Sequence, residues 1–188
     1  MSKVRVATAW LCGCSGCHMS LLNVDEEIIE LAKGIEFVMS PIVDMKEFDR
    51  CDLAIVEGAV SDSENLEVLR DIRGKCKELV ALGDCAVFGG MTSMRNLFDK
   101  QSVLERGFVE TETTTVGKVP AGEEVPELLD RARPLDAFVK VDHYIPGCPP
   151  DAKVIAYVVK RLMKGDEAKL PPEMIHFDSS RKPRRSGL

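Results

Sequence analysis

Apolar residues along the chain fall into short runs whose spacing alternates between that of strands and that of helices. Apolar and β-branched runs predict strands at Lys3–Trp10, Ile35–Met39, Leu53–Val56 and Leu79–Leu82. The first helical stretch repeats its apolar residues at Leu21, Val24, Ile28 and Leu31. Gly34 is expected to end this helix, and Ser63 to cap a second helix that runs through Cys76. The alternation predicts a parallel sheet with helices on both faces.

The second half of the chain is less regular. Gly89–Val125 is rich in Gly, Thr, Ser and charge, and we interpret it as a long functional loop region with short helical pieces. A helix is expected to start near Pro126, an extended piece to cover Val139–Ile145, and a last helix to span Asp151–Lys164. We predict one α/β domain over residues 1–188, with a flavodoxin-like parallel sheet and irregular loops at the carboxyl ends of its strands.

Composition and charge narrow the choice of partners. The chain has 188 residues and a formal net charge of −6, which argues against nucleic acid as a partner. No apolar run approaches the roughly 20 residues needed to cross a bilayer, and no signal peptide is visible. We therefore expect a cytoplasmic protein that does not bind membranes. The tail from about residue 178, which contains the basic run Arg181–Arg185, is expected to be a solvated terminus or a subunit contact.

Four of the seven cysteines share one topological position. Cys14 and Cys17 follow the first predicted strand, Cys85 follows the strand Leu79–Leu82, and Cys148 follows the last extended piece. Because ligands of open parallel sheets bind at the carboxyl ends of the strands, three separate loops should meet at one edge of the sheet. An odd number of cysteines in an unsecreted chain also fits poorly with a disulfide framework. These positions predict a shared metal site.

The residues around these cysteines suit a bulky inorganic group. Glycines that allow sharp turns and close approach of the backbone stand at Gly13, Gly16, Gly83 and Gly147. Three prolines stiffen the loop around Cys148. Four thiolates can hold an iron–sulfur cluster or a zinc ion, and the spacing leaves both open. A thioredoxin-like C-x-x-C pair at Cys14 and Cys17 would leave Cys85 and Cys148 unexplained.

The remaining three cysteines have different expected roles. Cys51 and Cys76 stand beside apolar runs, and we interpret both as buried small hydrophobic residues. Cys12 lies in the same loop as Cys14 and could replace it as a ligand. We favour Cys14, because Cys14 and Cys17 form a C-x-G-C unit with Gly16 at the tight turn.

Four motifs occur in order between residues 10 and 150. They are Trp10-Leu11-x-x-Cys14-x-Gly16-Cys17, Val56-Glu57-Gly58-Ala59-Val60, Gly83-Asp84-Cys85-Ala86 and Pro146-Gly147-Cys148-Pro149-Pro150. Together they resemble the motifs of the small subunits of nickel–iron hydrogenases. The longer forms Gly16-Cys17-His18-Met19-Ser20 and Met94-Arg95-Asn96 most resemble the small (delta) subunits of soluble NAD-reducing hydrogenases. The cluster-bearing small subunit of respiratory complex I belongs to the same fold family, but its first motif has two adjacent cysteines.

The resemblance implies a cofactor and a role. It implies a proximal [4Fe–4S] cluster bound by Cys14, Cys17, Cys85 and Cys148, and no further cluster, because no cysteine follows Cys148. The chain would relay electrons between the nickel–iron centre of a large subunit and diaphorase subunits that contain FMN and iron–sulfur clusters (H₂ + NAD⁺ = H⁺ + NADH). It would contain no bond-breaking site itself. A complex-I-like or other oxidoreductase subunit with a different electron donor is the alternative.

Other residues of these motifs have expected roles near the cluster. Glu57 could lie in a proton route or beside the partner's active site, or it could be a strand-end carboxylate facing solvent. Trp10, Gly16 and His18 are expected in the cluster environment, although Trp10 and His18 could equally serve the core or a subunit interface. A flavodoxin-like sheet raises the possibility of a flavin, but the cysteines occupy the first loop, so we expect no FMN in this chain.

Overall fold

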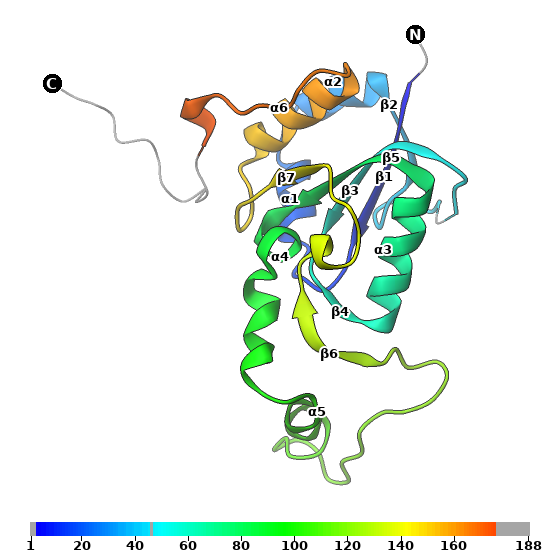
Figure 1. The fold of residues 1–188 in the computed structure, drawn as a ribbon, viewed down its shortest axis with the longest axis vertical. Helices are drawn as coiled ribbons and strands as arrows, with labels where there is room; N and C mark the ends of the chain where they lie inside the picture. Colours follow the sequence, from blue (N-terminus) through cyan, green and yellow to red (C-terminus); the bar gives the residue numbers. More distant parts are fainter. Residues whose placement is uncertain (1–2, 46, 176–188) are drawn as a thin grey trace, which may run out of the picture.

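A five-stranded parallel sheet forms the centre of the computed structural model, which describes residues 3–45 and 47–175 (Figure 1). Its strands lie in the order β2 (Ile35–Met39), β1 (Val4–Trp10), β3 (Cys51–Glu57), β5 (Cys76–Leu82) and β7 (His143–Ile145). Every neighbouring pair is parallel. The strand order is that of flavodoxin-like sheets, so the predicted fold class is confirmed.

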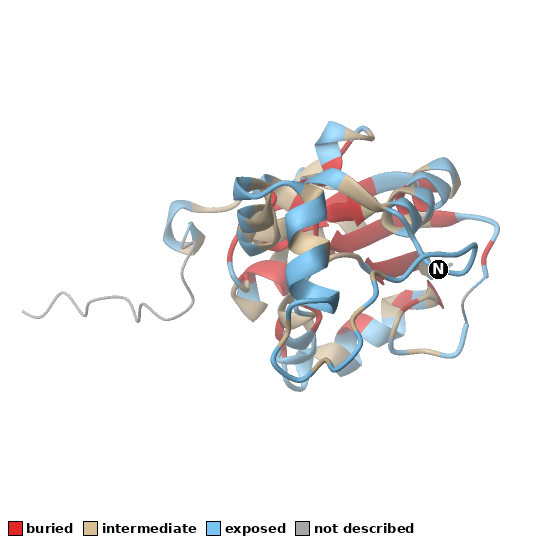
Figure 2. Cartoon of the chain, turned by 90° about the horizontal axis from the view of Figure 1, so that it is seen from below, coloured by how far each residue is buried: buried red, intermediate tan, exposed pale blue. Residues whose placement is uncertain are grey.

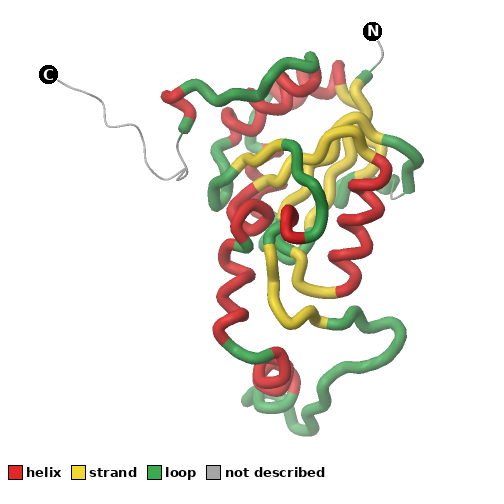
Figure 3. The backbone as a smooth tube through the Cα atoms, in the orientation of Figure 1, coloured by secondary structure: helices red, strands yellow, loops and turns green. Residues whose placement is uncertain are grey.

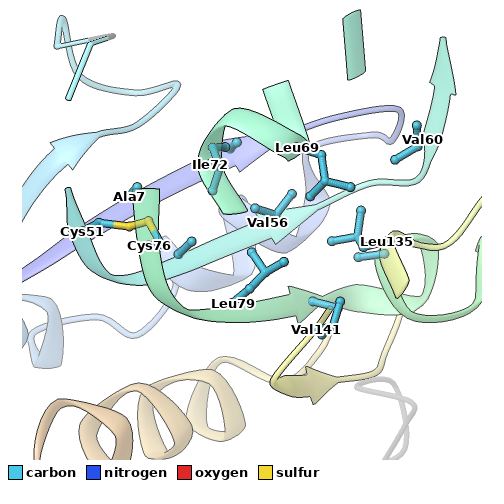
Figure 4. Packing of buried hydrophobic residues seen from close by; sticks show 14 of the residues in the cluster. Ala7, Cys51, Val56, Val60, Leu69, Ile72, Cys76, Leu79, Leu135 and Val141 are labelled. Atoms are coloured by element: carbon cyan, nitrogen blue, oxygen red, sulfur yellow. A yellow bond between two sulfur atoms is a disulfide. The ribbon is translucent and has the colours of Figure 1, made fainter. Parts of the chain in front are cut away.

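Helices cover both faces of this sheet, as predicted. On one face, Leu69 and Ile72 of α3 (Ser63–Lys75) are buried in a cluster with Val56 of the central strand (Figure 4). On the other face, the cluster contains Ile155 of α6 (Ala152–Met163). Figure 2 shows the buried residues concentrated on the strands and the inner sides of these helices. The core therefore consists of two apolar layers, one on each side of the sheet.

The remaining elements surround this core. They are α1 (Gly16–Leu22), α2 (Glu27–Gly34), α4 (Gly83–Phe88), α5 (Lys100–Phe108), the 3₁₀ helices η1 (Gly90–Leu97), η2 (Leu135–Ala137) and η3 (Pro172–Met174), and the strands β4 (Val60–Asp62) and β6 (Leu128–Arg133). The chain from η1 to α5 extends away from the sheet as a long arm (Figure 3). No helix in the described ranges has the length and apolarity that a bilayer crossing requires.

The strand β6 corrects one sequence prediction, the helix near Pro126. Residues Leu128–Arg133 pair instead with β4 in an antiparallel ribbon. The amide of Asn96 exchanges two hydrogen bonds of 2.8 Å with the backbone N–H and carbonyl of Ala132, which holds β6 in the extended form. Few of its side chains reach the core: Ala132 is buried, and Leu129 packs against the cluster that contains Val60.

Three helix boundaries also differ from the expectation. The first helical stretch is divided into α1 and α2, and Asp25 between them has a φ of 53°, a value that interrupts a right-handed helix. Asp62, not Ser63, caps α3, because its side chain accepts the N–H of Asn65 at 2.8 Å. Cys76 starts β5 and does not belong to the helix. The basic tail lies outside the described residues.

Cys51 and Cys76 differ in part from their predicted role. Both are buried, as expected, but they form a disulfide and are not independent hydrophobic side chains (Figure 4). They are direct partners in the register of β3 and β5. The spacing of the two cysteines in the sequence does not predict this disulfide, because they become neighbours only when the two strands align.

Candidate metal centre

The four predicted ligands lie beyond the carboxyl ends of three strands, two of them in loops and two in the first turns of α1 and α4. Cys14 and Cys17 follow β1, Cys85 follows β5, and Cys148 follows β7. Burial raises the pKa of the Cys17 thiol, and the neighbouring Cys14 and Cys85 raise it further. Burial also raises the pKa of Cys148, with Cys85 and Cys14 again contributing. Cys14 and Cys85 thus lie within electrostatic reach of both Cys17 and Cys148.

Gly83 keeps space open beside the first ligand loop. A Cβ atom at this position would lie 2.2 Å from the Cys17 sulfur, and Gly83 has a φ of 85° that favours glycine. At Gly16 a Cβ would lie 3.2 Å from the Cys14 sulfur. The left-handed residue of this turn is Ser15, with a φ of 63°, whereas Gly16 is the first residue of α1, so the turn lies one residue earlier than predicted. Glycine is therefore required where backbone and ligand sulfur nearly touch.

Cys12 is held apart from the ligand turn by its backbone. Its N–H donates to the carbonyl of Ala59 at 3.0 Å and its carbonyl accepts the N–H of Ala59 at 2.8 Å. This bridge ties the first loop to the segment that follows β3. Cys14, but not Cys12, is among the groups whose charge raises the pKa of both Cys17 and Cys148.

Glu57 is a buried anchor for the first ligand loop, and only 2% of the residue is exposed. Oε2 accepts the backbone N–H of Cys17 at 2.9 Å, and Oε1 lies 2.7 Å from Nδ1 of His18. Burial works to raise the pKa of Glu57, but hydrogen bonds from His18 and Cys17 and the charge of His18 outweigh it and lower this pKa. This burial and pairing exclude the alternative that Glu57 is a strand-end carboxylate facing solvent.

His18 is buried between Glu57 and Trp10. Its ring meets the Trp10 ring edge to face, with centroids 5.6 Å apart. Because a carboxylate only accepts, Nδ1 carries the proton shared with Glu57, and Nε2 is buried without a partner in the described residues. Buried polar atoms without partners are rare, so Nε2 is an orphan that a bound group could satisfy. Trp10 is about half exposed and covers one side of this ring.

No three His, Cys, Asp or Glu side chains within residues 3–45 and 47–175 gather closely enough to hold a single metal ion. A mononuclear zinc site draws four ligands to about 2–2.3 Å of one point. In a cluster, by contrast, each thiolate binds a different iron.

An apolar stripe, defined here as Phe88, Met91, Met94 and Leu97, begins one turn after Cys85. A 3₁₀ helix has three residues per turn, so the members in η1 lie on one face, and all four side chains are exposed. The opposite face is polar and anchored. Arg95, for example, donates from Nη2 to the carbonyl of Leu129 at 2.7 Å. The helix therefore shows its apolar side to solvent, which marks an interaction surface.

Comparison with known proteins identifies the class of this chain. The family model described as "NADH ubiquinone oxidoreductase, 20 Kd subunit" matches residues 14–162, and the chain belongs to this family.

Within the family, the similar proteins are hydrogenase subunits. The delta subunit of NAD-reducing hydrogenase HoxS from Cupriavidus necator is 37% identical over 180 residues, which cover 94% of this chain and 86% of the relative. In the crystal structure of an NAD⁺-reducing [NiFe]-hydrogenase in the H₂-reduced state, one chain matches with 40% identity and a TM-score of 0.90, covering 94% of this chain and 99% of that one. The resemblance inferred from the motifs is confirmed.

Other curated relatives are longer than this chain. A subunit of the F420-non-reducing hydrogenase from Methanothermobacter marburgensis is 38% identical over 174 residues, which cover 90% of this chain but only 56% of the relative. The chain therefore spans little more than half the length of that protein.

Proposed function

We propose that this chain binds one [4Fe–4S] cluster through Cys14, Cys17, Cys85 and Cys148, and that it is the electron-transfer subunit of a cytoplasmic NAD-reducing nickel–iron hydrogenase. The convergence of these four cysteines from three loops is the observation that carries the proposal. The similarity to the HoxS delta subunit supports the choice of enzyme.

The residues present fit such a cluster. The four thiols are free, and Gly83 leaves open the space next to the Cys17 sulfur that a side chain would fill. When bound, a [4Fe–4S] cluster accepts and releases one electron at a time, at a potential that its surroundings set.

The chain's own residues hold and shield this site. The thiolates supply one ligand to each iron, and Glu57 fixes the backbone of Cys17 and the ring of His18. Trp10 packs against that ring and limits the access of water from its side. No group for splitting H₂ is proposed in this chain, whose contribution is to place the cluster and tune its potential.

The partner on the apolar stripe would be the nickel–iron large subunit. The stripe continues directly from the helix that carries Cys85, so a protein docked there lies against the ligand edge. Exposed apolar surface of this kind is buried in stable complexes. Electrons would then pass to diaphorase subunits that carry FMN and iron–sulfur clusters, and no FMN is proposed in this chain.

A second candidate keeps the cluster but changes the redox partner. The longer relative from Methanothermobacter marburgensis comes from a hydrogenase described as F420-non-reducing, and the family model is described by a subunit of NADH ubiquinone oxidoreductase. The chain could therefore serve a complex-I-like or other oxidoreductase with a different electron donor.

The test is anaerobic purification of the native complex. The proposal requires close to four iron and four acid-labile sulfide per copy of this chain, together with nickel and H₂-dependent reduction of NAD⁺. Zinc without sulfide contradicts the cluster, whereas an active complex without nickel favours the second candidate. In the same complex, Cys14→Ser should lose the cluster and Cys12→Ser should keep it. The reverse result overturns the assignment of the first loop.

A further inference from the structure

Asp84 joins the loops of two candidate ligands. It stands directly before Cys85, and it contacts Gly147, the residue directly before Cys148. The backbone N–H of Asp84 donates to the carbonyl of Gly147 at 2.9 Å. In return, Oδ1 of Asp84 accepts the backbone N–H of Gly147 at 2.7 Å. One residue pair, 63 positions apart, therefore fixes the third ligand loop against the fourth.

This contact extends the sheet beyond its last paired residues. Leu82 of β5 and Ile145 of β7 are register partners, and Asp84 and Gly147 each lie two residues further along. The chain turns at Gly147, where φ is 137° and a Cβ would lie 2.6 Å from the Cα of Pro150. Because the backbone has left the ladder geometry there, the Asp84 carboxylate supplies the acceptor that a strand carbonyl supplies elsewhere.

The same carboxylate brings negative charge to the site. Asp84 is bonded directly to Cys85, and its Oδ1 lies 2.7 Å from the backbone nitrogen of Gly147, the residue before Cys148. No ion pair to Asp84 occurs among residues 3–45 and 47–175, whereas the other acidic anchor, Glu57, is paired with His18. In the described ranges the Asp84 carboxylate therefore has no side-chain cation beside it and accepts the backbone N–H of Gly147.

We propose that Asp84 is a positioning residue of the metal centre with two separable effects. Its hydrogen bonds hold Cys85 and Cys148 at the separation that one cluster needs. Its uncompensated charge opposes the extra negative charge that reduction adds, and so lowers the reduction potential of the cluster. The inference rests on the proposed function, because both effects require a cluster at these cysteines.

Two substitutions in the intact complex separate the two effects. Asp84→Asn keeps an oxygen that can accept the N–H of Gly147 but removes the charge. It should retain the iron and sulfide of the wild type and shift the midpoint potential, measured by a potentiometric EPR titration, in the positive direction. Asp84→Ala removes the acceptor and leaves that N–H unsatisfied. It should lose iron to a chelator about tenfold faster than the wild type does.

Asp71→Asn is the matched control for loss of one carboxylate charge. Asp71 is exposed near the end of α3 that leads into β5, at the opposite edge of the sheet from Cys85, and it pairs only with Lys75. In the Asp71→Asn variant, the midpoint potential of the cluster and the rate of iron loss should equal those of the wild type.

The possible results are distinguishable. If the cluster is present and has the same midpoint potential in Asp84→Asn as in Asp71→Asn, the electrostatic effect is overturned. Unchanged iron loss in Asp84→Ala overturns the positioning effect. In both cases the proposed function stands, because the cluster is present. A wild-type complex without labile sulfide overturns the proposed function and this inference together.

Discussion

Nδ1 of His18 lies 2.7 Å from Oε1 of Glu57, although the two residues are 39 positions apart and each is almost fully buried. The contact joins the helix after β1 to the end of β3, across the point where the strand order reverses. It fixes the orientation of His18 before any cofactor binds. The first ligand loop is therefore preorganised by a buried carboxylate.

Removal of that carboxylate should destabilise the protein strongly. Glu57→Ala leaves the N–H of Cys17 and the Nδ1 of His18 buried without an acceptor. Breaking a buried pair in this way typically costs about 3–5 kcal/mol of folding free energy. Urea unfolding of the purified chain measures the loss. Glu57→Gln retains an acceptor oxygen and should lose clearly less, so equal losses in the two variants would contradict an anchoring role.

Gly83 should tolerate no side chain. In Gly83→Ala, the new Cβ would lie 2.2 Å from the Cys17 sulfur and the backbone would keep a φ of 85°, so the first and third ligand loops must separate. We expect the variant to bind substantially less iron and sulfide than the wild type. Gly74→Ala in α3 is the matched control, because a Cβ there meets nothing within 4 Å.

That control should bind a full complement of iron, and its helix should gain up to about 1 kcal/mol in stability. A Gly83→Ala variant with the same iron content as Gly74→Ala would show that the ligand loops are not packed as described.

The apolar stripe should control assembly with the large subunit. Met94→Glu places a charge at the centre of this surface, and desolvation of an unpaired charge should weaken association by about tenfold or more. The measurement is the amount of large subunit that co-purifies with this chain. Met45→Glu is the matched control, since Met45 and Met94 are each 54% exposed and Met45 lies before β3, away from the ligand loops. Equal co-purification of both variants would locate the partner elsewhere.

The sequence predicted the parts of the fold that depend on local patterns. The strand Ile35–Met39 matches β2 in the structure, because a short apolar run bounded by Gly34 and Pro41 has few alternatives. The shared position of the four predicted ligand cysteines was predictable for a similar reason, since each follows a strand of a parallel sheet. Turns and strand ends both depend on residues only a few positions apart in the sequence, so local patterns predict them.

The parts that the sequence did not predict depend on contacts between distant residues. The strand β6 is polar and becomes extended because Asn96 binds its backbone at Ala132. The disulfide of Cys51 and Cys76 requires the register of two strands. The role of Asp84 emerges only when β5 and β7 lie side by side. Its place directly before a predicted ligand cysteine was the one signal in the sequence that could have indicated this contact.

The acid stability of the fold should depend on Asp142, which links β5 to β7. Its carboxylate accepts the backbone N–H of Leu79 at 2.9 Å and pairs with Arg73 at 2.5 Å and Lys140 at 3.0 Å. Burial works to raise the pKa of Asp142, but hydrogen bonds from Lys140, Leu79 and Arg73 outweigh it and lower this pKa from 3.8 to about 2.

Since the Asp142 carboxylate titrates at lower pH in the folded state, its stabilisation is complete above pH 3.8 and is lost as the pH falls through 2. The difference between the two pKa values corresponds to about 2 kcal/mol. Asp142→Asn should therefore reduce the unfolding free energy of the iron-free chain by this amount at neutral pH, and the two proteins should converge between pH 4 and pH 2. A difference that stays constant to pH 2 would attribute the loss to packing and not to charge.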